Sequence, residues 1–164
     1  MKITQKGDEF VITDFNEIEA YRIARKIEED GLRFYEGIMS EVDNEAVKDK
    51  IRILMSEERK HLRFFDDHLY KLDPNAADFE GDNILNYMDY GIFEPYKDIE
   101  GLGKKLDDVK MALKLGIKVE DNSVKFYQSA LDRVASEGAK EGLKDIIEEE
   151  KKHKQLFESI LEEV

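Results

Sequence analysis

Apolar residues recur every three or four positions in four long stretches of the chain, a spacing that is typical of amphipathic helices. Residues 15–72 are predicted to hold two helices that meet near Asp43, and residues 104–162 two more that meet in a tight turn at 136–138. Acidic residues favour helix N-termini, so we expect Asp14 to cap the first helix and Asp43 the second. The chain is therefore predicted to be all-α.

The two halves of the chain repeat each other at a distance of 92 residues, as in Ala20 and Ala112 (112 − 20 = 92). A single helical hairpin cannot bury its apolar stripe, so two such hairpins are expected to pack together. The repeat thus predicts a four-helix bundle made of two repeated helical hairpins. Identical pairs at this distance include Glu28/Glu120, Tyr35/Tyr127, Glu57/Glu149, Glu58/Glu150 and His61/His153.

Residues 1–164 are predicted to form one domain. Residues 73–103 are expected to be a long crossover that returns the chain parallel to the second helix. Residues 1–13 are interpreted as an N-terminal arm, or as a strand that pairs with a partner. The aromatic crossover and this arm favour a homodimer, one form of which would exchange hairpins.

Composition excludes several functions. With 26 Lys plus Arg against 39 Asp plus Glu, the formal charge of −13 disfavours nucleic acid as a partner. The absence of cysteine excludes thiol catalysis, cysteine-ligated zinc and iron–sulfur or rubredoxin sites within this chain. No run of 18 apolar residues and no signal-like N-terminus is present, so we expect a cytoplasmic protein without a membrane partner.

A carboxylate interrupts the apolar stripe of every predicted helix near its middle, and a histidine also interrupts two of the four stripes. Burying four carboxylates without compensation would be very costly, whereas two divalent cations would balance their charge. In Glu-x-x-His, both side chains lie on one helix face and can bind one metal, while the remaining glutamates bridge or cap the pair. The candidate metal ligands are Glu28, Glu58, His61, Glu120, Glu150 and His153.

Other residues near these positions are assigned different roles. Glu57 and Glu149 also lie within one turn of a candidate histidine, but they fall off the apolar stripe, as Glu29 does beside Glu28. We therefore predict that none of these three is a ligand. The third histidine, His68, lies two turns beyond the candidate site and is interpreted as structural or interfacial.

This ligand set resembles that of ferritin-like di-iron carboxylate proteins, in which two helices give one Glu each and two give Glu-x-x-His. The segments IEEDGLRFY (27–35) and VEDNSVKFY (119–127) resemble the rubrerythrin branch of that group. The resemblance covers residues 20–70 and 104–162 and implies a ferritin-like fold. Rubrerythrins carry a further carboxylate one turn after the third helix's glutamate. Ser123 stands there in this chain, which favours a simpler symmetric site.

The resemblance implies a non-haem di-iron oxidoreductase, with two iron ions as cofactor, that reduces peroxide or dioxygen. Without cysteine, its electrons would come from an external donor protein such as a rubredoxin. Ligand types leave manganese or a mixed-metal site open. The alternatives are a ferroxidase or iron-handling protein without peroxidase turnover, and a bundle used only as a scaffold.

Two further features concern the surroundings of the site. Tyr35 and Tyr127 follow the glutamates of the first and third helices by seven residues, and are expected either to donate hydrogen bonds to ligands or to be core tyrosines. Small residues near these glutamates are expected to leave space for the oxidant. They are Ala24, Gly31, Gly116 and Ser123.

Overall fold

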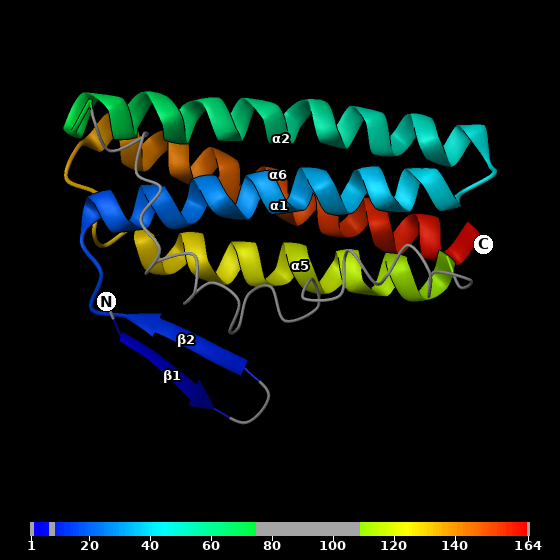
Figure 1. The fold of residues 1–164 in the computed structure, drawn as a ribbon, viewed down its shortest axis with the longest axis horizontal. Helices are drawn as coiled ribbons and strands as arrows, with labels where there is room; N and C mark the ends of the chain where they lie inside the picture. The colour runs from blue at the N-terminus through cyan, green and yellow to red at the C-terminus, as the bar shows by residue number, and fades with distance from the viewer. Residues whose placement is uncertain (1, 7–8, 75–108, 164) are drawn as a thin grey trace.

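The computed structural model of the chain describes residues 2–6, 9–74 and 109–163. Within these ranges four long helices lie side by side as one bundle (Figure 1). The bundle confirms the predicted all-α, ferritin-like class. The helices are α1 (Glu17–Glu41), α2 (Glu45–Leu72), α5 (Val109–Ala130) and α6 (Glu137–Glu163).

The helices form two antiparallel hairpins, α1 with α2 and α5 with α6, and α1 also packs along α5 (Figure 1). The colour gradient shows that α2 and α5 run in the same direction, as the sequence predicted. The predicted crossover at 73–103 lies, after Pro74, outside the described residues. No helix in the described parts of the chain is both long enough and apolar enough to cross a bilayer.

The N-terminal segment forms a β-hairpin within the chain. Strands β1 (Lys2–Lys6) and β2 (Glu9–Thr13) pair antiparallel, with Lys2 opposite Thr13. The hairpin projects from the bundle near the start of α1 (Figure 1). The sequence reading left open an arm or a strand paired with a partner, and the structure pairs the strand with the chain's own residues.

The helix N-caps differ from the predicted ones. Asn16, not Asp14, caps α1: its Oδ1 accepts the Glu19 N–H at 2.9 Å, and the Glu19 carboxylate accepts the Asn16 N–H at 2.9 Å. Asp14 instead has a φ of 56°, in the left-handed region that links β2 to the helix. Asn44, not Asp43, caps α2, and its side chain accepts from the N–H groups of the first turn. The prediction was one or two residues too early at each helix.

The predicted apolar stripes form the core of the bundle. The stripe positions are buried along the four segments, from Tyr21 to Val42, Val47 to Phe65, Leu113 to Val134 and Ala139 to Ile160. His68, the last position of the stripe on α2, is half-buried. Its Nδ1–H donates to the Phe64 carbonyl at 2.8 Å, and its ring lies 5.6 Å from that of Tyr21. These contacts within the chain give His68 a structural role in packing α1 against α2.

Candidate metal centre

The six predicted ligands meet at one level of the bundle, brought together by all four helices. Each is at most 2 % exposed, as buried as the surrounding Leu and Phe side chains. The Glu-x-x-His spacing places each histidine one turn after a glutamate on the inward face of α2 or α6. The structure thus brings together all six candidate metal ligands.

These residues form two overlapping groups, in each of which one potential ligand atom per residue lies within 4.8 Å of the others. Glu58 and Glu150 belong to both groups, whereas the glutamates of α1 and α5 belong to one each. The sequence reading had expected Glu28 and Glu120 to bridge or cap the metal pair; in the structure Glu58 and Glu150 are the carboxylates that the two groups share, and Glu28 and Glu120, in one group each, are called the capping glutamates below. The groups are Glu28, Glu58, His61 and Glu150, and Glu58, Glu120, Glu150 and His153.

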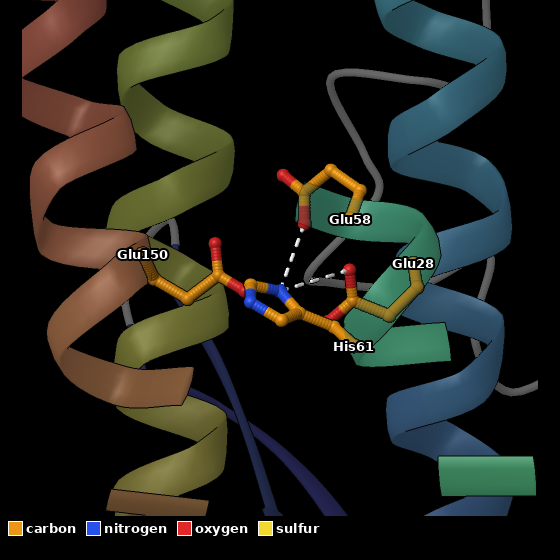
Figure 2. Close-up of side chains that lie close together, drawn as sticks. All are labelled: Glu28, Glu58, His61 and Glu150. Carbon is orange, nitrogen blue, oxygen red and sulfur yellow. Dashed lines mark hydrogen bonds and ion pairs between the residues drawn. The ribbon is translucent and has the colours of Figure 1, made fainter. Parts of the chain in front are cut away.

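The Nδ1 atoms of both histidines point at the shared carboxylates. His61 Nδ1 lies 3.1 Å from Glu58 and 3.8 Å from Glu28, the two contacts that are marked in Figure 2, and it also lies 3.1 Å from Glu150. His153 Nδ1 lies 3.2 Å from each of the same two carboxylates. The two rings stack with centroids 5.7 Å apart. The approximate twofold symmetry of the repeat is therefore preserved in the centre itself.

Two buried tyrosines join the hairpins at the capping glutamates. The Tyr127 hydroxyl donates to Glu28 Oε1 at 2.5 Å, and the Tyr35 hydroxyl donates to Glu120. Burial, followed by the charge of Glu28, raises the pKa of Tyr127 well above its usual value, so its hydroxyl stays protonated and remains a donor. Of the two roles considered for these tyrosines, hydrogen bonding to candidate ligands is the one that the contacts support.

The sequence reading did not anticipate a role for Glu57 and Glu149. His61 Nε2 lies 2.7 Å from Glu149 Oε2, and His153 Nε2 lies 2.9 Å from Glu57 Oε2. Each carboxylate therefore meets the histidine of the opposite helix, on the side of the ring away from the centre. Both residues are off the apolar stripe, as predicted. Because a glutamate occurs at this position in both halves of the repeat, the sequence did carry a signal that the two residues share a role.

Burial and neighbouring charge move the four ligand carboxyl groups in opposite directions. For Glu28 and Glu120, desolvation and the repulsion of Glu58 and Glu150 raise the pKa well above the ordinary value. Desolvation acts in the same sense on Glu58 and Glu150, but the contacts with the histidines outweigh it and lower their pKa. Without metal, the capping carboxyls therefore keep their protons to higher pH than the shared ones do.

The histidines supply the compensating charge. Desolvation opposes it, but contacts with Glu150 and Glu58 raise the pKa of His153 to about 12, and the pKa of His61 is also raised strongly. Protonated rings would then face the carboxylates of Glu58 and Glu150, so in the metal-free centre protons can supply part of the positive charge that metal ions would otherwise bring. Two divalent cations would balance four carboxylates and two neutral imidazoles equally well.

Comparison with known proteins identifies the family. The family model described as Rubrerythrin matches residues 1–70 and 19–161. The chain belongs to the rubrerythrin family. No curated protein and no solved structure matches it. Because it has no cysteine, this rubrerythrin-family chain contains no rubredoxin domain.

The donor set fits a pair of metal ions. Among the described residues, the buried Glu150 Oε1 has no hydrogen-bond partner, although His61 Nδ1 lies 3.1 Å away. With His61 neutral and its Nε2–H donated to Glu149, Nδ1 and Glu150 Oε1 both present lone pairs. A proton shared between these two atoms, or a metal ion bound by both, would satisfy the facing acceptors, so the donor set is one that a metal site can use.

The space expected beside the centre is partly filled. A Cβ at Gly116 would lie 3.2 Å from the Phe157 ring, so this glycine makes room for that ring rather than for an oxidant. Ser123 is buried and donates its hydroxyl to the Val119 carbonyl at 3.1 Å. The position of the family's additional carboxylate thus offers no metal ligand here.

Proposed function

We propose that this rubrerythrin-family protein is a non-haem di-iron oxidoreductase that reduces peroxide, or dioxygen, with electrons from an external donor protein such as a rubredoxin. The observation that carries the proposal is the pair of overlapping, fully buried Glu/His groups. Reduction of one peroxide breaks its O–O bond with two electrons and two protons and yields water. Manganese or a mixed pair would fit the same donors.

In this proposal each residue has a defined task. Glu28, Glu58, Glu120, Glu150, His61 and His153 hold the two metal ions. Bound iron would supply the electrons that reduce the oxidant, and open coordination positions at which the oxidant is polarised. Glu58 and Glu150, present in both groups, keep the two sites together.

The surroundings keep the centre dry and position its carboxylates. The Tyr127 and Tyr35 hydroxyls orient the capping carboxyls of Glu28 and Glu120 from the opposite hairpin. The Phe65 and Phe157 rings, both at most 1 % exposed, close the core around the site. Electrostatic interactions in such an environment are stronger than in water.

A second candidate is a ferroxidase or iron-handling protein without peroxidase turnover. The observation that favours it is Ser123, because the additional carboxylate associated with redox-dependent ligand movement in rubrerythrins is missing. A symmetric centre without that residue would bind and oxidise iron without the same rearrangement.

Stopped-flow oxidation separates the two functions. Anaerobic protein loaded with Fe(II) is mixed with peroxide in one run and with dioxygen in another. Fast oxidation by peroxide, slow oxidation by dioxygen and loss of both in Glu150→Ala support the peroxidase. Faster oxidation by dioxygen followed by release of Fe(III) supports the ferroxidase instead and contradicts the leading proposal.

A further inference from the structure

Two glutamates outside the ligand set contact the histidines crosswise. Glu149 of α6 lies 2.7 Å from His61 Nε2 of α2, and Glu57 of α2 lies 2.9 Å from His153 Nε2 of α6. Each directly precedes a shared ligand carboxylate in the sequence. Consecutive residues point about 100° apart on a helix, so one carboxylate of each pair faces inward and the other lies towards the helix surface.

The two carboxylates lie at the boundary between the centre and solvent. The side chains of Glu57 and Glu149 are 38 % and 43 % exposed, whereas those of the histidines they contact are 3 % and 2 % exposed. The inner nitrogen of each ring therefore faces the buried carboxylates, and the outer nitrogen faces a half-exposed one. The two nitrogens of each imidazole are therefore in different environments, one inside the core and one near solvent.

The chemistry of the contact fixes which nitrogen is available to a metal. An ionised carboxylate only accepts hydrogen bonds, so the nitrogen that faces it carries the proton. A neutral imidazole that donates Nε2–H outward has its lone pair on Nδ1. In both rings Nδ1 points to Glu58 and Glu150, at 3.1 to 3.2 Å.

The crossed arrangement also links two helices. The contacts between α2 and α6 are less extensive than those within either hairpin. Each Glu–His contact joins α2 to α6 at the level of the centre, so it restrains both the rotation of a ring and the separation of the helices that carry the ligands. Such a restraint reduces the reorganisation needed when a metal binds.

We propose that Glu57 and Glu149 are positioning residues of the metal centre, each holding the opposite helix's histidine so that Nδ1 faces the metal. This inference rests on the proposed di-metal function. Removing an outer partner of a metal-binding histidine typically weakens metal affinity 10- to 100-fold. The effect acts through the histidine, because neither carboxylate belongs to the two ligand groups.

Cobalt(II) binding to the full chain tests the proposal without an activity assay. Anaerobic titrations followed by visible ligand-field absorption compare the wild type with Glu149→Leu, Glu149→Gln, Glu57→Leu and Glu57→Gln. The control is Glu148→Leu, which removes the same charge from the adjacent position, where the carboxylate is 65 % exposed and pairs with Lys151.

We expect each Leu variant to bind one of its two cobalt ions 10- to 100-fold more weakly and with an altered spectrum. The Gln variants keep an acceptor for Nε2–H and should lose less, while Glu148→Leu should match the wild type. If a Leu variant fails to fold, the corresponding Ala variant, which also removes the acceptor, is compared with Glu148→Ala, and equal affinities overturn the inference.

The outcomes also separate this inference from the proposed function. Wild-type protein that binds no cobalt overturns the di-metal function and the positioning role with it. Wild-type protein that binds two ions, together with Glu57→Leu and Glu149→Leu variants of unchanged affinity and spectrum, overturns the positioning role alone.

Discussion

The candidate ligands of α1 and α5, Glu28 and Glu120, are as deeply buried as those of α2 and α6, Glu58 and Glu150. The pKa values of the two pairs are nevertheless shifted in opposite directions. Glu28 and Glu120 each receive a tyrosine hydroxyl and have a raised pKa. Glu58 and Glu150 contact both histidines and have a lowered pKa. The comparison teaches that the neighbouring donor, not burial alone, decides where charge resides in this core.

The largest expected effect comes from breaking the ionised pair in metal-free protein. Glu58→Gln or Glu150→Gln leaves buried imidazolium groups undercompensated, and we expect a loss of about 3–5 kcal/mol in the free energy of unfolding. Glu28→Gln and Glu120→Gln replace a neutral carboxyl by a neutral amide and should cost less than about 1 kcal/mol. Chemical denaturation with chelator present measures all four, and equal losses would contradict the assignment of charge.

The pH dependence of stability follows from the same comparison. In the unfolded chain glutamic acids titrate near 4.5 and histidines near 6.5, whereas the folded metal-free protein keeps the protons on Glu28, Glu120 and both imidazoles to higher pH. Stability from these groups is therefore present at low pH and falls as the pH rises through their raised pKa values. Glu58 and Glu150 act oppositely, and their contribution is lost as the pH falls below about 4.5.

Metal-free protein should accordingly be most stable in mildly acid solution and lose stability towards alkaline pH. Metal replaces protons at the centre, so its stabilising effect should grow with pH and its binding should release protons. Thermal unfolding at several pH values, with and without metal, measures the first effect, and calorimetry in buffers of different ionisation enthalpy the second. Metal stabilisation that is independent of pH would count against a proton-filled centre.

The tyrosine contacts sharpen the contrast between the two kinds of glutamate. Tyr127→Phe and Tyr35→Phe leave a buried carboxyl without its donor, and each should destabilise metal-free protein by about 1–3 kcal/mol. Tyr21→Phe is the control, because among the described residues its hydroxyl donates to Glu17 in a long, part-buried contact of 3.4 Å. Denaturation midpoints measure the difference, and a control that loses as much as the other two would refute it.

The smallest effects are expected for charged pairs at the surface of the same helices. Arg25 pairs with Asp66 between α1 and α2, and Lys154 pairs with Asp121 between α5 and α6. All four side chains are between 33 % and 41 % exposed, so Asp66→Asn or Asp121→Asn should cost less than about 1 kcal/mol. A loss comparable to that of Glu150→Gln would show that burial does not distinguish the two regions.

The bundle and the centre could be predicted because both leave a periodic signal. The three-and-four spacing indicates helices, and the repeat makes each interrupted stripe visible twice, which is why Glu58 and His61 stand out beside Glu150 and His153. The first residue of a helix was harder to predict, because Asp14 and Asn16 are both residue types that favour the N-cap position. Only the backbone conformation, left-handed at Asp14 and extended at Asn16, distinguishes them.

Other features depended on contacts between elements. Glu57 and Glu149 lie off the apolar stripe, and nothing on their own helices shows that each reaches a histidine on the other. The N-terminal hairpin did leave a signal, because Gly7 and Asp8 separate two short runs as in a two-residue turn. The Phe157 ring of α6 occupies the space beside Gly116 of α5. This contact depends on how the two helices pack, so the spacing of residues along the sequence does not predict it.

The most direct test of the central claim is the Fe(II) stoichiometry of the anaerobic protein by equilibrium dialysis with metal analysis. We predict two Fe(II) per chain for the wild type, about one for Glu28→Ala, which removes a residue of one group, and none tightly bound for Glu150→Ala, which removes a residue of both. A wild-type protein that binds no iron, or a Glu150→Ala variant that still binds two, would contradict a di-metal centre at these residues.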